Sequence, residues 1–522
     1  MNATGRPPSP RRGEIIAAIS LATDLAIGQP VEYALRSCAL AMRLARMRGL
    51  NLPTLAQVYH QALLRYIGCN AETHTMAALF GDEIAFRRDF ALVDQGRASE
   101  VGALVLAYLR RAHADAGALQ MIAGVVQGLA ASKSVAREGL SSHCEVAQRL
   151  AERLGFSAEV SRNLGQIYER WDGRGLPNGL KGDAIAPAVR IVSFAQDVIA
   201  LADAFGLEAT KAKVLARSGL AYEPGLAEGF VANVEALTDR IDATTWEDVL
   251  ALEPEPHAVL DEAAFDEACL AMADFADLKS PSSVGHSRAV AALAGEAARR
   301  CGLPNADATD LERAGLLHDI GQVAVPARIW MKAGPLNDSE WAQARLHSYF
   351  GERVLARPAA LARLGAIVGQ HHERLDGSGY HRGARGTSLS LQSRILAAVE
   401  CYQNKIEPRP HRPAYSAGAT AEALKREARE GRLDADAVSA VLSAAGHAAP
   451  ARKETLAGLT PREIDVLREI ARGRSTKEIA RSLGLSPKTV DNHTQSVFAK
   501  IDVKTRGGAT LFAIERGLCG AS

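Results

Sequence analysis

The sequence predicts an all-α protein with two related helical domains in tandem, followed by a smaller four-helix domain at the C-terminal end. Three observations support this fold class. The first half of the chain repeats motifs of the second half in register. Apolar residues around the candidate site recur at the spacing of buried helix faces. Residues 459 to 522 contain several helix-capping signatures, which predict short helices joined by tight turns.

The N-terminal end and the composition indicate a cytoplasmic protein without a membrane segment. Residues 1 to 12, rich in Pro and Arg, are expected to be a disordered tail. Arg11 and Arg12 precede an apolar stretch as in a signal peptide, but Glu14 and Asp24 interrupt that pattern and favour an amphipathic helix. No apolar run reaches the roughly 18 residues that a bilayer span requires. Seven cysteines without a Cys-x-x-Cys pair suit a reducing compartment, and a net charge of +1 indicates no particular partner.

Residues 13 to 210 are interpreted as a degenerate copy of residues 265 to 445. Residues 31 to 68 match residues 284 to 321 without a gap, and a second gap-free match begins at His143. An internal repeat of this size implies two packed, mostly helical domains.

The first copy lacks most of the side chains that could bind metal. Where the second copy has histidines and carboxylates, the first copy has Tyr33, Arg65, Tyr66, Ile167, Tyr168 and Gln196, and it keeps only His143. We therefore expect a scaffold without metal. The alternative is a retained ligand site at residues 171 to 177. Residues 211 to 264 carry no site motif and are expected to form a helical connector.

The most distinctive motif lies at residues 371 to 380, which read His-His-Glu-Arg-Leu-Asp-Gly-Ser-Gly-Tyr. Adjacent imidazoles leave the backbone in different directions, so they suit two neighbouring metals better than a single ion. A second pair, His318 and Asp319, lies upstream. His286 and His347 each share a helix face with apolar residues, where a lone histidine is usually part of the core.

Together these motifs resemble the HD-GYP family of metal-dependent phosphodiesterases that hydrolyse cyclic di-GMP, over residues 265 to 445. The resemblance implies a set of divalent-metal ligands, namely His286, His318, Asp319, His347, His371, His372 and Glu400. Glu400 stands where the family has Asp. Nitrogen and oxygen ligands suit iron or manganese, and also zinc or nickel. We expect a binuclear centre bridged by Asp319, because Ser282 stands where some members hold a third metal through Glu.

The resemblance also implies catalytic and substrate-binding residues. The catalytic set is His318, Asp319 and Gln322, and the substrate-binding set is Asp376, Gly377, Gly379, Tyr380 and Arg412. Three positions depart from the family, since Gln322 replaces Lys, His381 replaces Pro and Gln403 replaces Asp. A neutral amide stabilises phosphate charge less than a cation does. Metal binding is therefore expected to persist, while turnover is expected to be slow.

The segment after a linker at residues 446 to 458 has the signatures of a helix-turn-helix. Thr460 and Ser486 each precede a Pro, as an N-cap does before the first helical position, and Ser475 with Glu478 forms a capping box. Gly484 supplies a turn between two short helices. The segment resembles the LuxR-type DNA-binding domain over residues 459 to 518.

The resemblance implies duplex DNA as the partner of residues 459 to 522, which contain eleven Lys or Arg against seven Asp or Glu. The helix from Pro487 to Lys500 is expected to enter the major groove, with Val490 and Val497 facing the core. The DNA-contacting set is Lys488, Thr489, Asn492, His493 and Gln495 at the bases, with Lys500 and Lys504 near phosphates. A solvated polar face is the alternative. LuxR-type domains pair through a final helix, so a homodimer is expected.

Two functions compete for the whole chain. In the first, a phosphodiesterase for cyclic di-GMP or a related cyclic dinucleotide is coupled to DNA binding in a transcriptional regulator. In the second, the departures at Gln322, His381, Glu400 and Gln403 leave a metal-bound nucleotide sensor without turnover. A third reading is a constitutive DNA-binding protein whose helical copies are structural.

Overall fold

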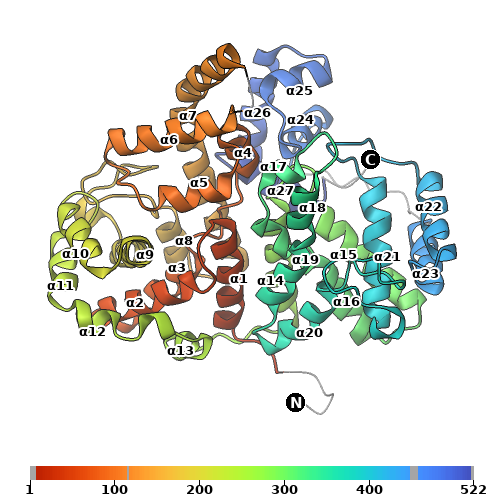
Figure 1. Ribbon diagram of the computed structural model, residues 1–522, viewed down its shortest axis with the longest axis horizontal. Coiled ribbons are helices and arrows are strands. Elements are labelled where there is room, and N and C mark those ends of the chain that lie inside the picture. The colour runs from red at the N-terminus through yellow and green to blue at the C-terminus, as the bar shows by residue number, and fades with distance from the viewer. Residues whose placement is uncertain (1–7, 115–116, 447–456, 519–522) are drawn as a thin grey trace. The chain divides into compact units, whose positions relative to one another are not determined.

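The computed structural model describes residues 8–114, 117–446 and 457–518 and confirms the all-α class (Figure 1). Over these residues there are 27 α-helices, four short 3-10 helices and no β-strand. None of the described helices combines the length and the apolar character that crossing a bilayer would require. Most of the predicted tail, residues 1–7, and most of the predicted linker, residues 447–456, lie outside the described residues.

The chain divides into two compact units, the first spanning Ser9–Ala264 and the second containing Phe265–Ser522. The helices of the first unit are α1 (Arg12–Ala26), α2 (Tyr33–Met47), α3 (Leu52–Leu64), α4 (Thr73–Phe80), α5 (Glu83–Phe90), α6 (Ala98–Ala112), α7 (Ala118–Arg153), α8 (Ala158–Leu164), α9 (Pro187–Phe205), α10 (Leu207–Ala216), α11 (Pro224–Ala232), α12 (Val234–Thr238) and α13 (Trp246–Ala251). The last three fall in the predicted connector, and α10 crosses its start.

The second unit contains the candidate site and the C-terminal domain. Its helices are α14 (Glu262–Asp277), α15 (His286–Arg300), α16 (Asn305–Leu317), α17 (Ala327–Trp330), α18 (Asp338–Arg345), α19 (His347–Leu355), α20 (Ala359–Val368), α21 (Leu391–Ile406), α22 (Ala417–Arg429), α23 (Ala435–Ala445), α24 (Pro461–Ala471), α25 (Thr476–Leu483), α26 (Pro487–Lys500) and α27 (Arg506–Glu515). The 3-10 helices are η1 (Gly182–Ala184), η2 (Ile241–Ala243), η3 (Ile320–Ala324) and η4 (Gly386–Ser388).

The two units repeat the same local contacts, which supports the repeat read from the sequence. In the first unit a buried Asp24 carboxylate accepts the backbone N–H of Ala34 near the start of α2. In the second unit, Asp277 accepts the equivalent N–H of Ser287 near the start of α15. A carboxylate there satisfies an amide that has no partner within the helix.

Glycines at matching positions make the same close approach in both units. A Cβ atom on Gly68 would lie 2.1 Å from the carbonyl oxygen of His143, and one on Gly321 would lie 2.0 Å from that of His347. Any larger residue would separate these segments, so the backbone crossing that places each histidine depends on glycine.

The core of the second unit brings the ends of several helices to one place. Helix α15 packs against α16, α21 and α23. The approach of α16 is close, because a Cβ atom on Gly315 would lie 2.7 Å from the Cα atom of Ala291. Val290 and Ala294 are fully buried on α15, as are Leu317 and Val399 on α16 and α21. Burying an aliphatic side chain of this size stabilises the fold by about 1.5 to 3 kcal/mol.

The C-terminal domain forms four helices with the predicted caps. Thr460 and Ser475 each form a capping box, and the Ser486 hydroxyl accepts the backbone N–H of Thr489. Gly484 ends α25 in the left-handed region, with φ of +64°. This conformation favours glycine and turns the chain from α25 into α26.

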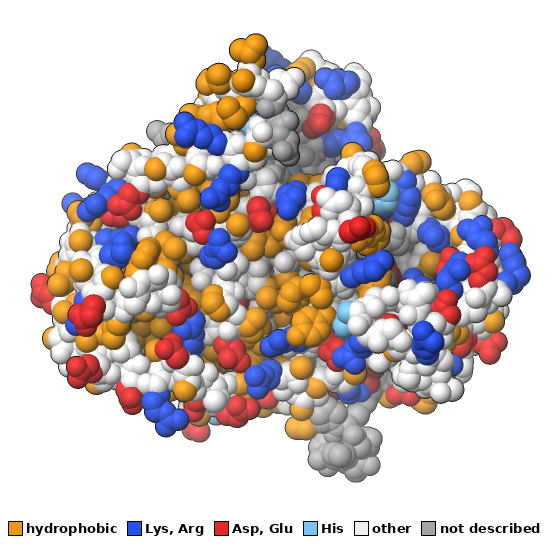
Figure 2. Space-filling view, viewed as in Figure 1, with side chains coloured by type: hydrophobic (Ala, Val, Ile, Leu, Met, Phe, Trp, Pro, Cys, Tyr) orange, Lys and Arg blue, Asp and Glu red, His pale blue; other side chains and the backbone are white. Residues whose placement is uncertain are grey.

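On the face seen in Figure 2, blue Lys and Arg side chains are interspersed with red Asp and Glu side chains. This mixture agrees with the net charge of +1. The overall charge therefore favours no particular class of partner.

Candidate metal centre

The seven predicted metal ligands come from helix ends and from the middle of one helix. His286 and His347 are the first residues of α15 and α19, and His318 follows the last residue of α16. His371 and His372 lie in the turn after α20, and Glu400 lies within α21. The structure brings all of them together with Asp319.

His286, His318 and Glu400 form a first triad, whose ligand atoms all lie within 4.8 Å of one another. Oε2 of Glu400 lies 3.0 Å from Nε2 of His286 and 3.4 Å from Nε2 of His318. All three residues are buried. The longer side chain of Glu400 thus reaches both histidines.

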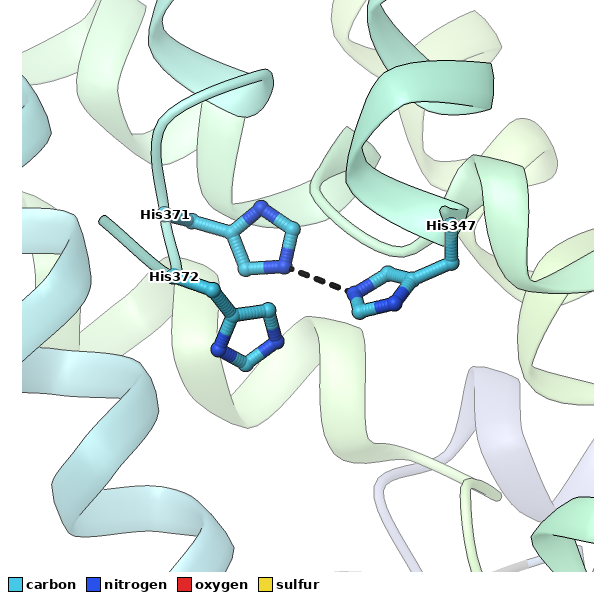
Figure 3. A group of neighbouring side chains, drawn as sticks. All are labelled: His347, His371 and His372. Carbon is cyan, nitrogen blue, oxygen red and sulfur yellow. Dashed lines mark hydrogen bonds between the residues drawn. The ribbon is translucent and has the colours of Figure 1, made fainter. Parts of the chain in front are cut away.

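His347, His371 and His372 form a second triad (Figure 3). The Nε2 atoms of His347 and His371 face each other at 3.0 Å. Their Nδ1 atoms lie 2.6 Å from the carbonyl oxygens of Ala344 and Val368. A carbonyl can only accept, so each Nδ1 carries the proton, and in the neutral rings both Nε2 lone pairs point at the same place. A cation between them satisfies both, and metal-binding histidines are commonly oriented in this way.

His318 shows the same preparation for a cation. Its Nδ1 atom donates to the carbonyl oxygen of Gly315 at 2.8 Å. Its buried Nε2 atom lies 3.4 Å from a carboxylate oxygen of Asp319 and 3.4 Å from one of Glu400, without the geometry of a hydrogen bond. A cation among these atoms could bind all three side chains. The donor set therefore fits divalent metal.

Asp319 lies between the two triads. Its Oδ2 atom is 3.4 Å from Nε2 of His318, and its Oδ1 atom is 3.3 Å from Nε2 of His347. Although burial by itself raises the pKa of Asp319, His318 and His347 hold it well below the usual range. The carboxylate is thus ionised, with one oxygen toward each triad, which is the geometry of a bridging ligand.

The two triads differ in their charge when no metal is bound. Burial lowers the pKa of His318, but Asp319 and Glu400 outweigh burial and raise it to about 10. Burial, with His347 and His318 nearby, lowers the pKa of His371 to about 3. Without metal, His318 of the first triad is therefore protonated at pH 7, whereas His371 of the second triad is neutral.

Glu407 is a functional residue that the sequence reasoning missed. Its Oε2 atom lies 2.7 Å from Nδ1 of His286, and its Oε1 atom accepts a hydrogen bond of 2.7 Å from Gln403. A carboxylate on the second ring nitrogen fixes the orientation of a ligating histidine. The predicted loss of a carboxylate at Gln403 is thus offset one helical turn later. Only the helical spacing of residues 403 and 407 could have indicated this.

The HD domain family model matches residues 126–217 and 271–437, and the family model for bacterial regulatory proteins of the luxR family matches residues 457–513. The chain is an HD-domain protein with a luxR-family domain. Both matches agree with the resemblances read from the sequence, and the first HD match covers the later part of the degenerate copy.

Several curated proteins are similar to this HD-domain protein. The 3'3'-cGAMP-specific phosphodiesterase 3 of Vibrio cholerae serotype O1 is 29% identical over 406 residues, which cover 77% of this chain and 87% of that protein. A cyclic di-GMP phosphodiesterase of Pseudomonas aeruginosa is 37% identical over 163 residues, covering 31% of this chain and 39% of that protein. The crystal structure of V-cGAP3, a cyclic GMP-AMP specific phosphodiesterase of V. cholerae, has a TM-score of 0.58 at 24% identity. The match covers 84% of this chain and 99% of the chain in that structure, and it supports the fold.

A cavity of about 540 Å³ opens beside the metal ligands of the second HD domain. Its walls include the aromatic side chains Trp330, Trp341 and Tyr380, and the cations Lys332, Arg374, Lys405 and Arg409. The Tyr380 ring stacks on His372 with 4.3 Å between centroids. Such a lining suits a ligand with flat rings and negative charge.

The predicted substrate-binding set lies only partly in this cavity. Tyr380 is in the wall, but Asp376, Gly377 and Gly379 are not among the lining residues. Asp376 accepts the backbone N–H of Ser378. A Cβ atom on Gly379 would lie 2.5 Å from the Cα atom of Glu373. These residues make their contacts within the loop, and for this reason they do not line the cavity.

Arg412 and Gln322, which were predicted to bind substrate and to act in catalysis, both make hydrogen bonds within the protein. The guanidinium of Arg412 donates to the carbonyl oxygens of Asn404, Lys405 and Glu407, so it holds the loop while Arg409 lines the cavity. The Gln322 amide accepts from Ser283 at 3.2 Å and donates to the carbonyl of Ala276 at 3.3 Å. Although Gln322 borders the cavity, both ends of its amide are engaged within the protein.

In the luxR-family domain, the side chains of α26 that were predicted to contact DNA bases differ in their exposure. Lys488, Asn492 and Gln495 are exposed, and Thr489 and His493 are half-buried, whereas Val490 and Val497 are buried as expected. Lys504 is exposed beyond the helix. Lys500 differs, because its Nζ atom lies 2.7 Å from a carboxylate oxygen of Glu463. Its charge is therefore engaged within the domain.

Proposed function

We propose that residues 265 to 445 form a metal-dependent phosphodiesterase for a cyclic dinucleotide, and that the luxR-family domain couples it to duplex DNA. One observation carries the enzymatic part of the proposal. Asp319 directs one oxygen toward each of the two triads. In four histidines of these triads the Nδ1 atom contacts a carbonyl or carboxylate oxygen, which leaves Nε2 facing the other ligands. These residues would hold divalent metal, which when bound would supply Lewis-acid activation of a phosphate and of the attacking water.

The residues around the metal ligands can bind the rest of a cyclic dinucleotide. Trp330, Trp341 and Tyr380 offer rings on which bases can stack. Arg374 and Arg409 can offset the charge of the two phosphates. Burial raises the pKa of Tyr380 to about 12, so its hydroxyl stays protonated at neutral pH and can donate a hydrogen bond.

The substrates for which two similar proteins are named support a particular class of substrate. The relative with the longest match among those described above is named for 3'3'-cGAMP, and the other for cyclic di-GMP. We propose that this chain takes a 3'–5' linked cyclic dinucleotide containing at least one guanine. Iron or manganese is the proposed metal, since the ligands are nitrogen and oxygen only.

The test is an assay of the full chain with manganese or ferrous iron, offered cyclic di-GMP and 3'3'-cGAMP. We expect linear dinucleotide product, and no product from Asp319→Asn. Tight nucleotide binding without product would instead support the sensor alternative. The departures at Gln322, His381 and Gln403 favour a slow rate.

For the C-terminal domain we propose sequence-specific duplex DNA binding by a homodimer in the cytoplasm. The family match and the exposed polar residues of α26 support this role. Half-sites would lie about 10 base pairs apart, as two-fold helix-turn-helix dimers require. Nucleotide-dependent DNA affinity distinguishes a coupled regulator from a constitutive DNA-binding protein.

A further inference from the structure

A buried arginine in the first HD domain lacks hydrogen-bond partners. Arg65 occupies the position that matches His318, and its side chain is 6% exposed. Its Nε and Nη1 atoms are buried and have no hydrogen-bond partner in the described part of the chain. The Tyr66 ring, 5.4 Å from the guanidinium, offsets the charge only in part. Buried N–H donors without an acceptor are costly, so a ligand that accepts from them is favoured.

Arg65 lines a cavity of about 50 Å³ in the first unit. Tyr168, Trp171, Arg190 and Asp197 also line it. One water occupies about 30 Å³ in the liquid, so the space holds a group of only a few heavy atoms. A complete dinucleotide does not fit inside it.

The other cations in the wall already have partners. Arg170 pairs with Asp94 at 2.9 Å, and Arg190 pairs with Glu223 at 2.9 Å. Arg217 donates to the carbonyl oxygen of Leu92 at 3.0 Å. Arg65 therefore differs from them in having two buried nitrogen atoms, Nε and Nη1, that make no hydrogen bond among the described residues.

The acidic residues of the wall accept no hydrogen bond from the Nε and Nη1 atoms of Arg65 either. Glu169 accepts the backbone N–H groups of Asn178 and Leu180, each at 2.8 Å. Asp197 accepts the Tyr222 hydroxyl at 3.0 Å. Asp197 also interacts electrostatically with Arg65 and so offsets part of the guanidinium charge, although burial raises the pKa of this carboxyl. Asp94 and Glu223 are used by the arginines named above.

We propose that the first HD domain binds a phosphate group at Arg65, in a site that has exchanged metal ions for a guanidinium. Arginine is well suited to phosphate because its N–H groups donate charge-assisted hydrogen bonds. The phosphate is either free inorganic phosphate or the terminal group of a mononucleotide, whose base would lie toward Trp171 at the cavity wall. This inference does not depend on activity in the second HD domain.

The test is isothermal titration of the metal-free full chain with inorganic phosphate at constant ionic strength. The variants are Arg65→Met, Arg65→Lys and, as a matched control, Arg110→Met, since Arg110 is exposed in the same unit. We expect phosphate binding to be lost in Arg65→Met, weakened about tenfold in Arg65→Lys, and unchanged in the control, on the scale of one charged hydrogen bond. Residual phosphate at the second HD domain would persist in every variant as a separate binding step.

Folding is checked by thermal unfolding without phosphate. Removing Arg65 also removes its attraction to Asp197, so the unfolding midpoint of Arg65→Met is compared with that of the parent to establish that the variant is folded. Identical phosphate binding in the parent and Arg65→Met, or no phosphate binding in the parent, would overturn the proposal and leave the cavity to water. GMP binding more tightly than phosphate, with quenched tryptophan fluorescence, identifies the mononucleotide source; equal affinity identifies free phosphate.

Discussion

The Oε2 atom of Glu407 lies 2.7 Å from the Nδ1 atom of His286, on the side of the ring opposite Glu400. The carboxylate accepts the Nδ1 proton and thereby directs Nε2 at the metal position. Gln403 holds Glu407 in turn, through its amide N–H. We therefore treat Glu407 as a positioning residue for the first triad.

Glu407→Ala should lower metal affinity by about 10-fold to 100-fold, as loss of such outer partners does. Metal content after dialysis against graded chelator measures this. Gln403→Asp in the same chain should restore part of the affinity, because it returns a carboxylate within one helical turn. The control is Glu422→Ala, an exposed acid. Equal metal retention in Glu407→Ala and the control would contradict the assignment.

Asp319→Asn should empty or weaken both metal positions at once, because each carboxylate oxygen faces one triad. His372→Ala should affect mainly the second triad. Elemental analysis of anaerobically purified protein should thus give fewer metals per chain for Asp319→Asn than for His372→Ala. A parent protein without metal, or the reverse order of the two variants, would argue against a bridging Asp319.

Asp277 should make stability depend on pH. Burial raises its pKa to about 7, although His286 and Ser287 oppose the shift. The pKa of an unfolded Asp is about 3.9, so the folded state binds the extra proton between these values. Stability contributed by protonated Asp277 is therefore present at low pH and is lost as pH rises from about 4 to about 7.

Urea unfolding of the metal-free protein across this pH window measures the effect. Asp277→Asn should flatten the decline, since an amide keeps an acceptor for the Ser287 amide and does not ionise. Asp338→Asn, at an exposed position, is the control. A decline that is equally steep in Asp277→Asn would exclude Asp277 as its source.

Arg409 and Arg412 should respond differently to truncation. Arg409 lines the cavity, so Arg409→Ala should raise KM for the cyclic dinucleotide by about 10-fold or more, on the scale of one charged hydrogen bond. Arg412 donates to backbone carbonyls, so Arg412→Ala should lower the unfolding midpoint instead. Steady-state kinetics and thermal unfolding separate the two. A larger KM effect at Arg412 than at Arg409 would return the substrate role to Arg412.

Lys488 and Lys500 should also separate. Lys488→Ala should weaken binding to all DNA sequences and reduce the salt slope by about 1, if it contacts one phosphate. Lys500→Ala should mainly destabilise the domain, by about 1 kcal/mol or less because the pair with Glu463 is partly exposed. Titration with genomic fragments at two salt concentrations measures the first effect. A larger loss of salt slope in Lys500→Ala would show that its pair opens on DNA.

The sequence by itself determined the fold class, and it predicted the internal repeat and a set of candidate metal ligands. These follow from local patterns: capping residues such as Ser475, helical spacing, and the pair of adjacent histidines at 371 and 372. Each is encoded within a few neighbouring residues, so no long-range contact is needed to read it.

Only the tertiary structure decided which polar groups face the cavity. Arg409 and Arg412 are three residues apart and chemically identical, but one lines the cavity and the other is bonded to the loop that carries it. Glu407 reaches His286 across 121 residues of sequence. In the sequence, Arg65 indicates that a metal ligand has been lost. In the structure its Nε and Nη1 atoms are buried without a hydrogen bond, which makes it a candidate ligand site. Hydrogen-bond partners depend on packing between distant helices, and a linear pattern does not contain that information.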